Sequence, residues 1–471
     1  MNRIAKAFFL LFVGFVASRG AGQEPQKIKE PDERYKVDIL VVVAHPDDEA
    51  AVTPYLARAI YDLHKNVAVV FGTRGGSGGN DYGREHGPAM ADVREIEARR
   101  ACAKLGIDKV WFLGGKDTAS QNVLNSLANW GHGESLEELV RIVRLTRPEV
   151  VITWLPGIFI GENHGDHQAA GVLATEAFDL AADPVAFPAQ LAGASKRLEP
   201  YLENLTPWQP KKIYYFSDAN DQKQFAGHGF AHSVREVSPS QKKPYWLLAL
   251  RAAEPHLTQF PDEIHRWSSL SDEDIQKAMS DPSHLWWSEP ETLILGKSIT
   301  NIAPSNGPAA DVFAGIVTGQ NTLQVRLPQS MTSDSAEAQI RLGGPWLYYS
   351  QFRVAHGLEN LPKAAVPEIA VKSGSLLVVP VEVSHGLGVS QEITLQVKTP
   401  DGWKVTSGDG KLALPPERQT ALRVEIQTPE LSPDALKTAH PLNVAVELII
   451  DGKRSGLVQM NVLLGRSGLP Q

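Results

Sequence analysis

Short apolar runs alternate with segments of helical periodicity through the first half of the chain. The apolar runs are Val37–Val43, Val67–Phe71, Val110–Leu113, Val150–Trp154 and Ile213–Phe216. The segments with apolar residues at helical spacing are Ala51–Leu63, Asp92–Leu105, Leu136–Leu145 and His167–Ala182. This alternation is typical of βαβ units, and near-continuous apolar strands indicate a sheet that is covered on both faces. The pattern therefore predicts an α/β fold with a mostly parallel sheet and helices on both faces.

The pattern changes from about Val366 onward, where apolar and polar residues alternate. Five segments show this period, separated by turn residues: Leu376–Val383, Ile393–Lys398, Ala421–Gln427, Ala445–Ile450 and Leu457–Leu464. Regularly spaced strands with turn signals between them predict an all-β, immunoglobulin-like sandwich of roughly 100 residues. The stretch between the two regions is weaker, with a helical pattern at Tyr245–Glu254 and an extended one at Leu293–Ile302.

These patterns divide the chain of 471 residues into five parts. In residues 1–22, Arg3 and Lys6 precede the apolar run Phe8–Ala17, which is typical of an export signal and shorter than the ~20 residues of a membrane-spanning helix. An uncleaved membrane anchor is the alternative. Residues 23–36 are predicted to be a polar linker. The α/β domain is expected at 37–260, an extension or small β region at 261–360, and the β-sandwich at 361–471.

Charge and cysteine content exclude several kinds of partner and site. The formal net charge of -8 provides no basic footprint, so nucleic acid and anionic membrane surfaces are poor partners. The single cysteine, Cys102, can form neither an intrachain disulfide nor a thiolate zinc site. Its neighbours Ala101 and Leu105 indicate an inert thiol on the buried face of a helix.

Ionisable side chains gather directly after two of the apolar runs. Residues 44–49 read Ala-His-Pro-Asp-Asp-Glu after the first run, and residues 164–167 read His-Gly-Asp-His after the run Val150–Trp154. Ligands bind at the carboxyl ends of strands in open α/β sheets, and ionisable groups that are buried together need compensation such as a metal ion. A solvated polar loop is the alternative for either group alone. Together, the two groups predict one shared metal site.

Three of these side chains suit a metal ion. His45 and Asp48 are three residues apart, and His167 is a candidate third ligand from a neighbouring strand end. Two nitrogens, one oxygen and an open position are typical of catalytic zinc, which lowers the pKa of its bound water to about 7. Asp47, adjacent to the ligands, is a candidate general base for that water.

His164 and Asp166 are candidates for the remaining catalytic roles. A carboxylate two residues from an imidazole can hold the tautomer of that imidazole and favour its charged form. A charged His164 beside the metal would stabilise an oxyanion and protonate a leaving amine. The two residues are therefore expected to act as a pair.

The same residues carry a specific family resemblance. Residues 44–49 match the A-H-P-D-D-E motif of the PIG-L/LmbE-like N-acetylglucosaminyl deacetylase superfamily, and residues 164–167 are similar to its H-x-D-H motif, with Gly165 where proline is common. The resemblance covers about Val37–Gln259 and implies a Rossmann-like fold, a zinc ion and hydrolysis of an acetamide on a sugar. It also implies roles for five residues: His45, Asp48 and His167 as ligands, Asp47 as base and His164 as oxyanion or acid residue. The glycine is expected only to loosen its loop.

Three further residues match the family pattern. Arg94 and Glu97 resemble its R-x-x-E helix, where the arginine reaches substrate, and Asp117 matches an aspartate that contacts sugar hydroxyls. An exposed helical ion-pair face is the alternative for the first pair, and a helix cap or turn residue is the alternative for Asp117. Trp286 and Trp287 are expected to pack in the core, with stacking on sugar rings as the alternative.

The sequence thus predicts an exported, periplasmic or extracellular zinc-dependent hydrolase that removes the N-acetyl group from an N-acetylglucosamine-type sugar or glycoconjugate. Other divalent metals fit an O/N ligand set as well. A non-catalytic, metal-dependent glycan-binding protein is the alternative from another class, and a hydrolase of another amide is the alternative within the enzymes. No membrane span is expected after cleavage of the signal, and the oligomeric state is left open.

Overall fold

The computed structural model describes residues 33–157, 164–191, 205–217, 225–260, 266–280, 285–300, 311–318, 321, 323, 338–362, 366–385, 388–416 and 419–465. The predicted signal peptide and most of the predicted linker lie outside these residues. Among the helices that the structure describes, none combines the length and apolarity needed to cross a membrane.

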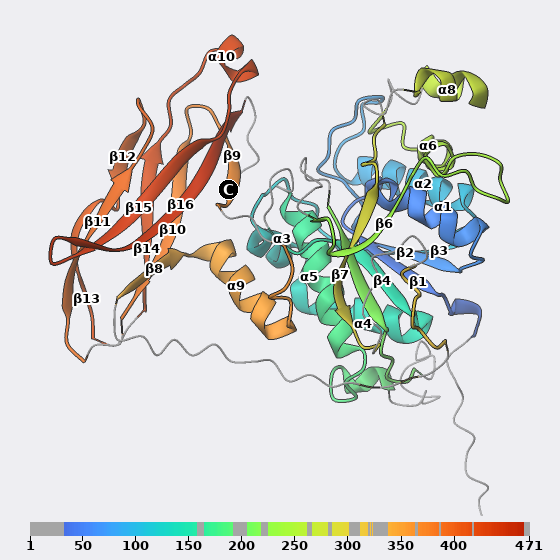
Figure 1. Ribbon diagram of the computed structural model, residues 1–471, viewed down its shortest axis with the longest axis horizontal. Coiled ribbons are helices and arrows are strands. Elements are labelled where there is room, and N and C mark those ends of the chain that lie inside the picture. Colours follow the sequence, from blue (N-terminus) through green and yellow to red (C-terminus); the bar gives the residue numbers. More distant parts are fainter. Residues whose placement is uncertain are drawn as a thin grey trace, which may run out of the picture.

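A seven-stranded sheet forms the centre of the larger part of the molecule (Figure 1). Its strands lie in the order β3-β2-β1-β4-β5-β7-β6. The first five strands in this order are parallel, and β7 and β6 continue the sheet in antiparallel pairs. The strand bounds are β1 Ile39–Val43, β2 Val67–Thr73, β3 Lys109–Gly115, β4 Val150–Trp154, β5 Lys212–Phe216, β6 Gly229–His232 and β7 Glu291–Ser298. The predicted mostly parallel sheet is confirmed.

Helices cover both faces of this sheet, with α1, α2 and α6 on one side and α3, α4 and α5 on the other (Figure 1). Their bounds are α1 Thr53–Tyr61, α2 Pro88–Lys104, α3 Val123–Asn129, α4 His132–Thr146, α5 Gly165–Leu180 and α6 Tyr245–Ala253. Shorter elements are η1 Glu33–Tyr35, η2 Asp48–Val52, η3 Pro188–Leu191 and α8 Asp272–Ala278. The two helix layers leave no face of β1 or β4 in contact with water.

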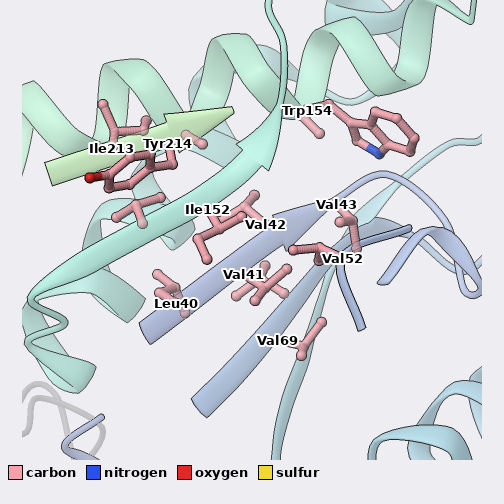
Figure 2. Close-up of a cluster of buried hydrophobic side chains, with 14 of the residues drawn as sticks. Leu40, Val41, Val42, Val43, Val52, Val69, Ile152, Trp154, Ile213 and Tyr214 are labelled. Carbon is pink, nitrogen blue, oxygen red and sulfur yellow. The ribbon is translucent and has the colours of Figure 1, made fainter. Parts of the chain in front are cut away.

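The main hydrophobic core lies between the sheet and these layers (Figure 2). Val41 of β1 is in register with Val69 of β2 and Ile152 of β4, and all three are fully buried. Trp154 lies at the end of β4 on the same side as Val43 and Val52 (Figure 2). Burial on both faces explains why these strands are continuous apolar runs rather than alternating ones.

The chain reverses its direction of travel across the sheet between β1 and β4. It passes from β1 to β2 and β3 on one side, and then from β4 to β5 on the other. Loops leaving the carboxyl ends of two such neighbouring strands diverge and form a crevice, where ligands bind in open α/β folds. Both ionisable motifs follow these two strands.

Two smaller sheets form the C-terminal all-β part, with strand orders β12-β14-β10-β8 and β13-β11-β15-β16-β9. One hydrophobic core includes residues of both sheets. The bounds are β8 Gln339–Leu342, α9 Gly344–His356, β9 Glu368–Lys372, β10 Leu376–Ser384, β11 Gln391–Lys398, β12 Lys404–Ser407, β13 Gly410–Leu414, β14 Gln419–Gln427, α10 Pro433–Lys437, β15 Leu442–Ile450 and β16 Lys453–Gly465. The all-β character is confirmed, whereas the immunoglobulin-like assignment stays a prediction.

The stretch 261–360 contributes to both parts of the molecule. Strand β7 pairs with β5 in the large sheet, whereas β8 pairs with β10 in a C-terminal sheet. Helix α9 then packs against α3 and α5. The predicted extended pattern at Leu293–Ile302 corresponds to β7, and the predicted helix at Tyr245–Glu254 corresponds to α6.

Candidate active site

The two ionisable motifs meet in the crevice between β1 and β4. His45 and Asp48 follow β1, and His167 lies in the first turn of α5 after β4. One ligand atom from each of these three residues lies within 4.8 Å of the other two. We call His45, Asp48 and His167 the metal cluster. The structure therefore brings together the three residues that the sequence singles out as metal ligands.

Asp48 has one oxygen fixed by the protein and one that faces the other two members of the cluster. Its Oδ2 accepts hydrogen bonds from the backbone N–H groups of Ala44 and His45 and from Trp154 Nε1, each at 2.9 Å. Its Oδ1 lies 3.2 Å from His167 Nε2 and 3.6 Å from His45 Nδ1. The carboxylate is thus positioned to offer a single oxygen.

These distances suit a small divalent cation. Ligand bonds of about 2.0–2.1 Å in a tetrahedral zinc site place two ligand atoms roughly 3.3 Å apart. The separations of 3.2 and 3.6 Å between Asp48 Oδ1 and the two imidazole nitrogens lie close to that value. Two imidazole nitrogens and one carboxylate oxygen leave a position for water or substrate. The residues present therefore fit a divalent metal ion.

The second nitrogen of His45 faces two carboxylates. His45 Nε2 lies 3.3 Å from Asp166 Oδ2 and 3.2 Å from Asp117 Oδ1. A proton on Nε2 is favoured there, which leaves Nδ1 unprotonated toward the cluster, as in metal sites where a carboxylate orients the ligating histidine. The carboxylate of Asp166 thus contacts His45, and His45, His164 and Asp166 form a second group whose candidate ligand atoms all lie within 4.8 Å of one another.

Charge interactions shift the pKa values of two members of the metal cluster, His45 and Asp48. Burial alone lowers the pKa of His45, but the carboxylates of Asp48, Asp117 and Asp166 outweigh it and hold that pKa well above its usual value. Burial raises the pKa of Asp48, and the charges of His167 and His45 more than reverse this effect. The carboxylates thus favour a positive charge at the cluster. A metal ion supplies that charge when it binds and displaces a proton from its ligands.

His164 is the N-cap residue of α5 and lies against the cluster. Its Nδ1 accepts a hydrogen bond of 3.2 Å from the backbone N–H of Asp166, and its ring centre is 4.7 Å from that of His45. Burial, together with repulsion from His45 and His167, lowers the pKa of His164 to about 3. The lowered pKa favours the neutral imidazole over the charged form expected from the sequence, and a neutral ring whose Nδ1 accepts carries its proton on Nε2.

Asp47 has a backbone conformation that sets it apart from the ligands. Its φ of 108° lies in a region that non-glycine residues rarely adopt, and its N–H donates to Glu49 Oε2 at 3.0 Å. Burial raises the pKa of Asp47 to about 6, against the opposing charge of Arg94. Such a carboxyl is close to the ideal for proton transfer near neutral pH.

Arg94 and Asp117 both contact protein groups. Arg94 is 3% exposed, and its guanidinium lies 3.1 Å from Asp47 Oδ1 and donates to the carbonyls of Pro46 and Gly75. The second oxygen of Asp117 accepts from the Ser77 N–H at 2.8 Å. Both side chains are therefore held by protein groups, and their contact with substrate stays a prediction.

Several positioning residues were not predicted from the sequence. The ring of Trp154 stacks on His167 with centroids 4.2 Å apart and planes 1° apart. His256 Nε2 pairs with Glu49 Oε1 at 2.6 Å, and Thr258 donates twice to Glu97. A sequence signal for the last two was available, because His256 and Thr258 lie within Val37–Gln259, the range that the family resemblance covers.

Gly165 packs tightly, contrary to the expectation that it loosens the loop. Its N–H donates to the carbonyl of Ser120 at 2.7 Å. A Cβ at this position would lie 2.7 Å from both Ser120 O and Ser126 Oγ. The glycine thus lets the start of α5 lie close to Ser120 and Ser126. This contact helps to hold its chain neighbours His164 and Asp166 in place beside the cluster.

A pocket of about 570 Å³ adjoins the metal cluster. Asp47, Asp48 and His167 line it, and aromatic side chains form much of the rest: Trp154, Phe216, Phe260, Trp286 and Trp287. Trp287 is 7% exposed, and its Nε1 donates to Ala50 O at 2.7 Å, whereas Trp286 is 38% exposed. The predicted core packing thus applies to Trp287, and Trp286 offers its ring to the pocket.

Comparisons with known proteins point to one family. The model of the PIG-L family, described as "GlcNAc-PI de-N-acetylase", matches residues 40–178. A 1D-myo-inositol 2-acetamido-2-deoxy-alpha-D-glucopyranoside deacetylase of Thermobifida fusca is 30% identical over 195 residues, which are 37% of this chain and 60% of that protein. The chain therefore spans about three fifths of that relative's length. A protein of Frankia casuarinae with the same name followed by the number 2 is 32% identical over 311 residues, which are 59% of this chain and 93% of that protein.

A solved structure is also similar. The N,N'-diacetylchitobiose deacetylase from Pyrococcus horikoshii is 19% identical, and the match covers 57% of this chain and 87% of that chain with a TM-score of 0.36. The family assignment itself comes from the sequence matches. The family model covers both motifs, and the match to the Frankia casuarinae protein covers nearly the whole length of that relative. The chain belongs to the PIG-L family.

Proposed function

We propose that this protein is a metal-dependent N-deacetylase that removes the acetyl group from an N-acetylglucosamine-type sugar or glycoconjugate. The observation that carries the proposal is Asp47, which lines the same pocket as the metal cluster but is not one of its three members. A protein that only binds a glycan through a metal has no need of such a base. The names of the matched relatives support the acetamido sugar as substrate.

His45, Asp48 and His167 are the proposed ligands, and zinc is the proposed metal. When bound, the ion would polarise the acetamide carbonyl and lower the pKa of a water molecule. The two-nitrogen, one-oxygen donor set favours zinc among common ions, although other divalent ions suit the same ligands. Trp154 and Asp166 would hold the ligands in orientation through Asp48 and His45.

Asp47 is the proposed general base. Its carboxylate faces the pocket beside the cluster and would take the proton of the attacking water and return it to the leaving nitrogen. Arg94 holds the carboxylate through a contact of 3.1 Å. This contact keeps Asp47 from rotating toward the metal position, so that its oxygen stays available for proton transfer.

His164 is the proposed oxyanion residue. Because its Nδ1 accepts from the Asp166 N–H, its Nε2–H is the donor that can point at charge developing on the carbonyl oxygen. A neutral donor in a buried site stabilises an oxyanion without the cost of desolvating a charge. The products are acetate and a free amino sugar.

Export and domain layout remain parts of the proposal. The basic residues and apolar run at the N-terminus support secretion to the periplasm or the exterior. The catalytic part would comprise residues 37–260 together with β7, and the C-terminal all-β part would begin near β8 or β9. Amino sugars of cell walls or of the environment are then the accessible substrates.

Acetate release from a panel of N-acetylated amino sugars, with and without chelator, tests the proposal. We expect release that stops with chelator and returns with added zinc. Asp47→Asn should keep the bound metal and lower kcat on the order of 10²–10⁴-fold. Asp108→Asn, an exposed carboxylate ahead of β3, serves as the control. Bound metal with no release from any sugar would contradict the proposal.

A further inference from the structure

A second pocket lies where the α/β part meets the C-terminal sheets. Its volume is about 350 Å³. Its lining includes Asn122 and Asn125 from the start of α3 and Trp346 of α9. The C-terminal sheets contribute Glu368, Pro380 and Arg423. We call it the junction pocket. Among the described residues, it shares no lining residue with the pocket beside the metal cluster.

The two halves of the junction pocket are held together by specific hydrogen bonds. The side-chain amide of Gln121 donates to Ala370 O and accepts from Ala370 N on β9. Tyr349 of α9 donates to Gln168 Oε1 at 2.8 Å. Because both glutamines also line the pocket, its shape is fixed by contacts between the two parts rather than by one part alone. Ligand pockets occur preferentially at such domain interfaces.

One wall of the junction pocket is apolar, and one of the residues that form it carries an unsatisfied donor. Trp346 and Pro380 supply a flat apolar surface. The Nε1 of Trp346 is buried, and no hydrogen-bond partner for it exists in the described ranges. A buried donor without a partner is costly, and native structures usually satisfy such groups with a ligand or water.

Glu368 provides a buried acceptor on the same pocket. It is 8% exposed, and burial is what raises the pKa of its carboxyl above the usual value. Arg423 also lines the pocket, but its guanidinium lies 3.6 Å from Glu425. The described structure therefore shows no cation paired with Glu368, and the carboxyl group is available to a ligand.

The asparagine side chains add both kinds of hydrogen-bonding group. Asn122 Oδ1 accepts from the Leu124 N–H at 3.0 Å, so that its Nδ2 is left to donate. Asn125 Nδ2 donates to Ser120 Oγ at 3.3 Å, so that its Oδ1 is left to accept. The pocket thus combines an indole ring with acceptors and donors arranged around it.

We propose that the junction pocket binds a hexopyranose ring, as a second saccharide site separate from the metal cluster. A pyranose has an apolar C–H face that suits an indole ring and a rim of hydroxyl groups that both donate and accept. The buried Glu368 disfavours a phosphate or another anion, and it equally disfavours an acyl chain. The proposal rests on the proposed function only in taking a glycan to be the natural ligand.

Calorimetric titration of the full-length, metal-loaded protein tests this inference. The probes are an N,N'-diacetylated amino-sugar disaccharide and its fully deacetylated counterpart. We expect binding to the wild type, and at least a tenfold weaker Kd for Trp346→Ala and Glu368→Gln. Acetate release from an N-acetylated monosaccharide should be unchanged, because neither residue contacts the cluster. Glu392→Gln, an exposed carboxylate on β11, is the matched control.

The NMR signals of the indole N–H groups provide a second measurement, which is made on the wild-type protein and leaves the pocket side chains intact. The Trp346 N–H signal, assigned with Trp346→Phe, should shift when either probe is added. Binding unaffected by both substitutions, or a Trp346 signal that does not move at saturating probe, would overturn the inference. Trp346-dependent binding without any acetate release would instead overturn the proposed function alone.

Discussion

Trp154 contacts two members of the metal cluster at once. Its Nε1 donates to Asp48 Oδ2 at 2.9 Å, while its ring lies parallel to that of His167. Trp154 is the last residue of β4. Its two contacts therefore hold Asp48 of the first motif and His167 of the second in position relative to the end of this strand. The relationship makes Trp154 a positioning residue for metal binding.

Trp154→Phe is therefore expected to weaken metal binding while the fold persists. Phenylalanine keeps a ring against His167 but removes the donor to Asp48. Loss of such an outer contact typically costs about 10–100-fold in metal affinity. Competition with a chromophoric chelator measures the Kd. Trp208→Phe removes an equivalent indole donor, to Pro148 O, outside the site. Equal affinities for wild type and Trp154→Phe would show that the contact is incidental.

Gly165→Pro should destabilise this chain even though proline is common at this position in the family. Proline removes the N–H that donates to Ser120 O, and its ring occupies the space that a Cβ already overfills. Lost hydrogen bonding and overpacking together predict a decrease of about 2–4 kcal/mol in the free energy of unfolding. Urea denaturation measures it, with Gly133→Ala on the open face of α4 as control. A variant as stable as the wild type would refute the packing argument.

Arg94→Lys should lower kcat with little change in metal content. Lysine keeps the charge, but one ammonium cannot replace the planar guanidinium that contacts Asp47 and two carbonyl groups. A misplaced base reduces turnover by about tenfold or more. Steady-state kinetics and metal analysis on the same sample separate the two effects. If KM rises while kcat stays constant, Arg94 binds substrate, as the family resemblance implies.

Asp179 links three elements through charge, and its contribution should depend on pH. Its carboxylate pairs with Lys297 of β7 and lies 2.7 Å from His356 Nδ1 of α9. Burial raises the pKa of Asp179, but His356 and Lys297 outweigh it and hold that pKa below its usual value of 3.8. Because the pKa is lower in the folded state, the pairing stabilises the fold above the unfolded-state value and is lost as the pH falls through the folded-state value.

Asp179→Asn is accordingly expected to cost on the order of 2 kcal/mol at pH 7, as for removal of one partner of a partly buried pair. The difference from the wild type should shrink progressively below about pH 4. Urea unfolding at several pH values measures the difference. Asp434→Asn, from an exposed pair with Lys437, should have almost no effect. A difference that is independent of pH would show that volume or hydrogen bonding, not charge, is responsible.

The parallel strands of the sheet were predictable because each carries its own signal. Strands such as β1 and β4 are buried on both faces and read as unbroken apolar runs, and helices such as α1 and α4 show their periodicity directly. The strands that escaped prediction, β6, β8, β9, β12 and β13, have four or five residues each. Short segments carry too few apolar positions for a period to emerge.

The sequence by itself determined which residues are the candidates for the chemistry, because ionisable side chains so dense at the ends of buried strands are costly unless they bind a ligand or a metal. Only the tertiary structure decided how those residues are divided into roles. The carboxylate of Asp166 contacts His45, and Arg94 holds Asp47 rather than facing open solvent. These pairings join residues far apart in the chain, and their distances depend on strand order, helix packing and the tight contact at Gly165. Local patterns report local structure, whereas the pairing of charges follows from which chain segments the core brings together.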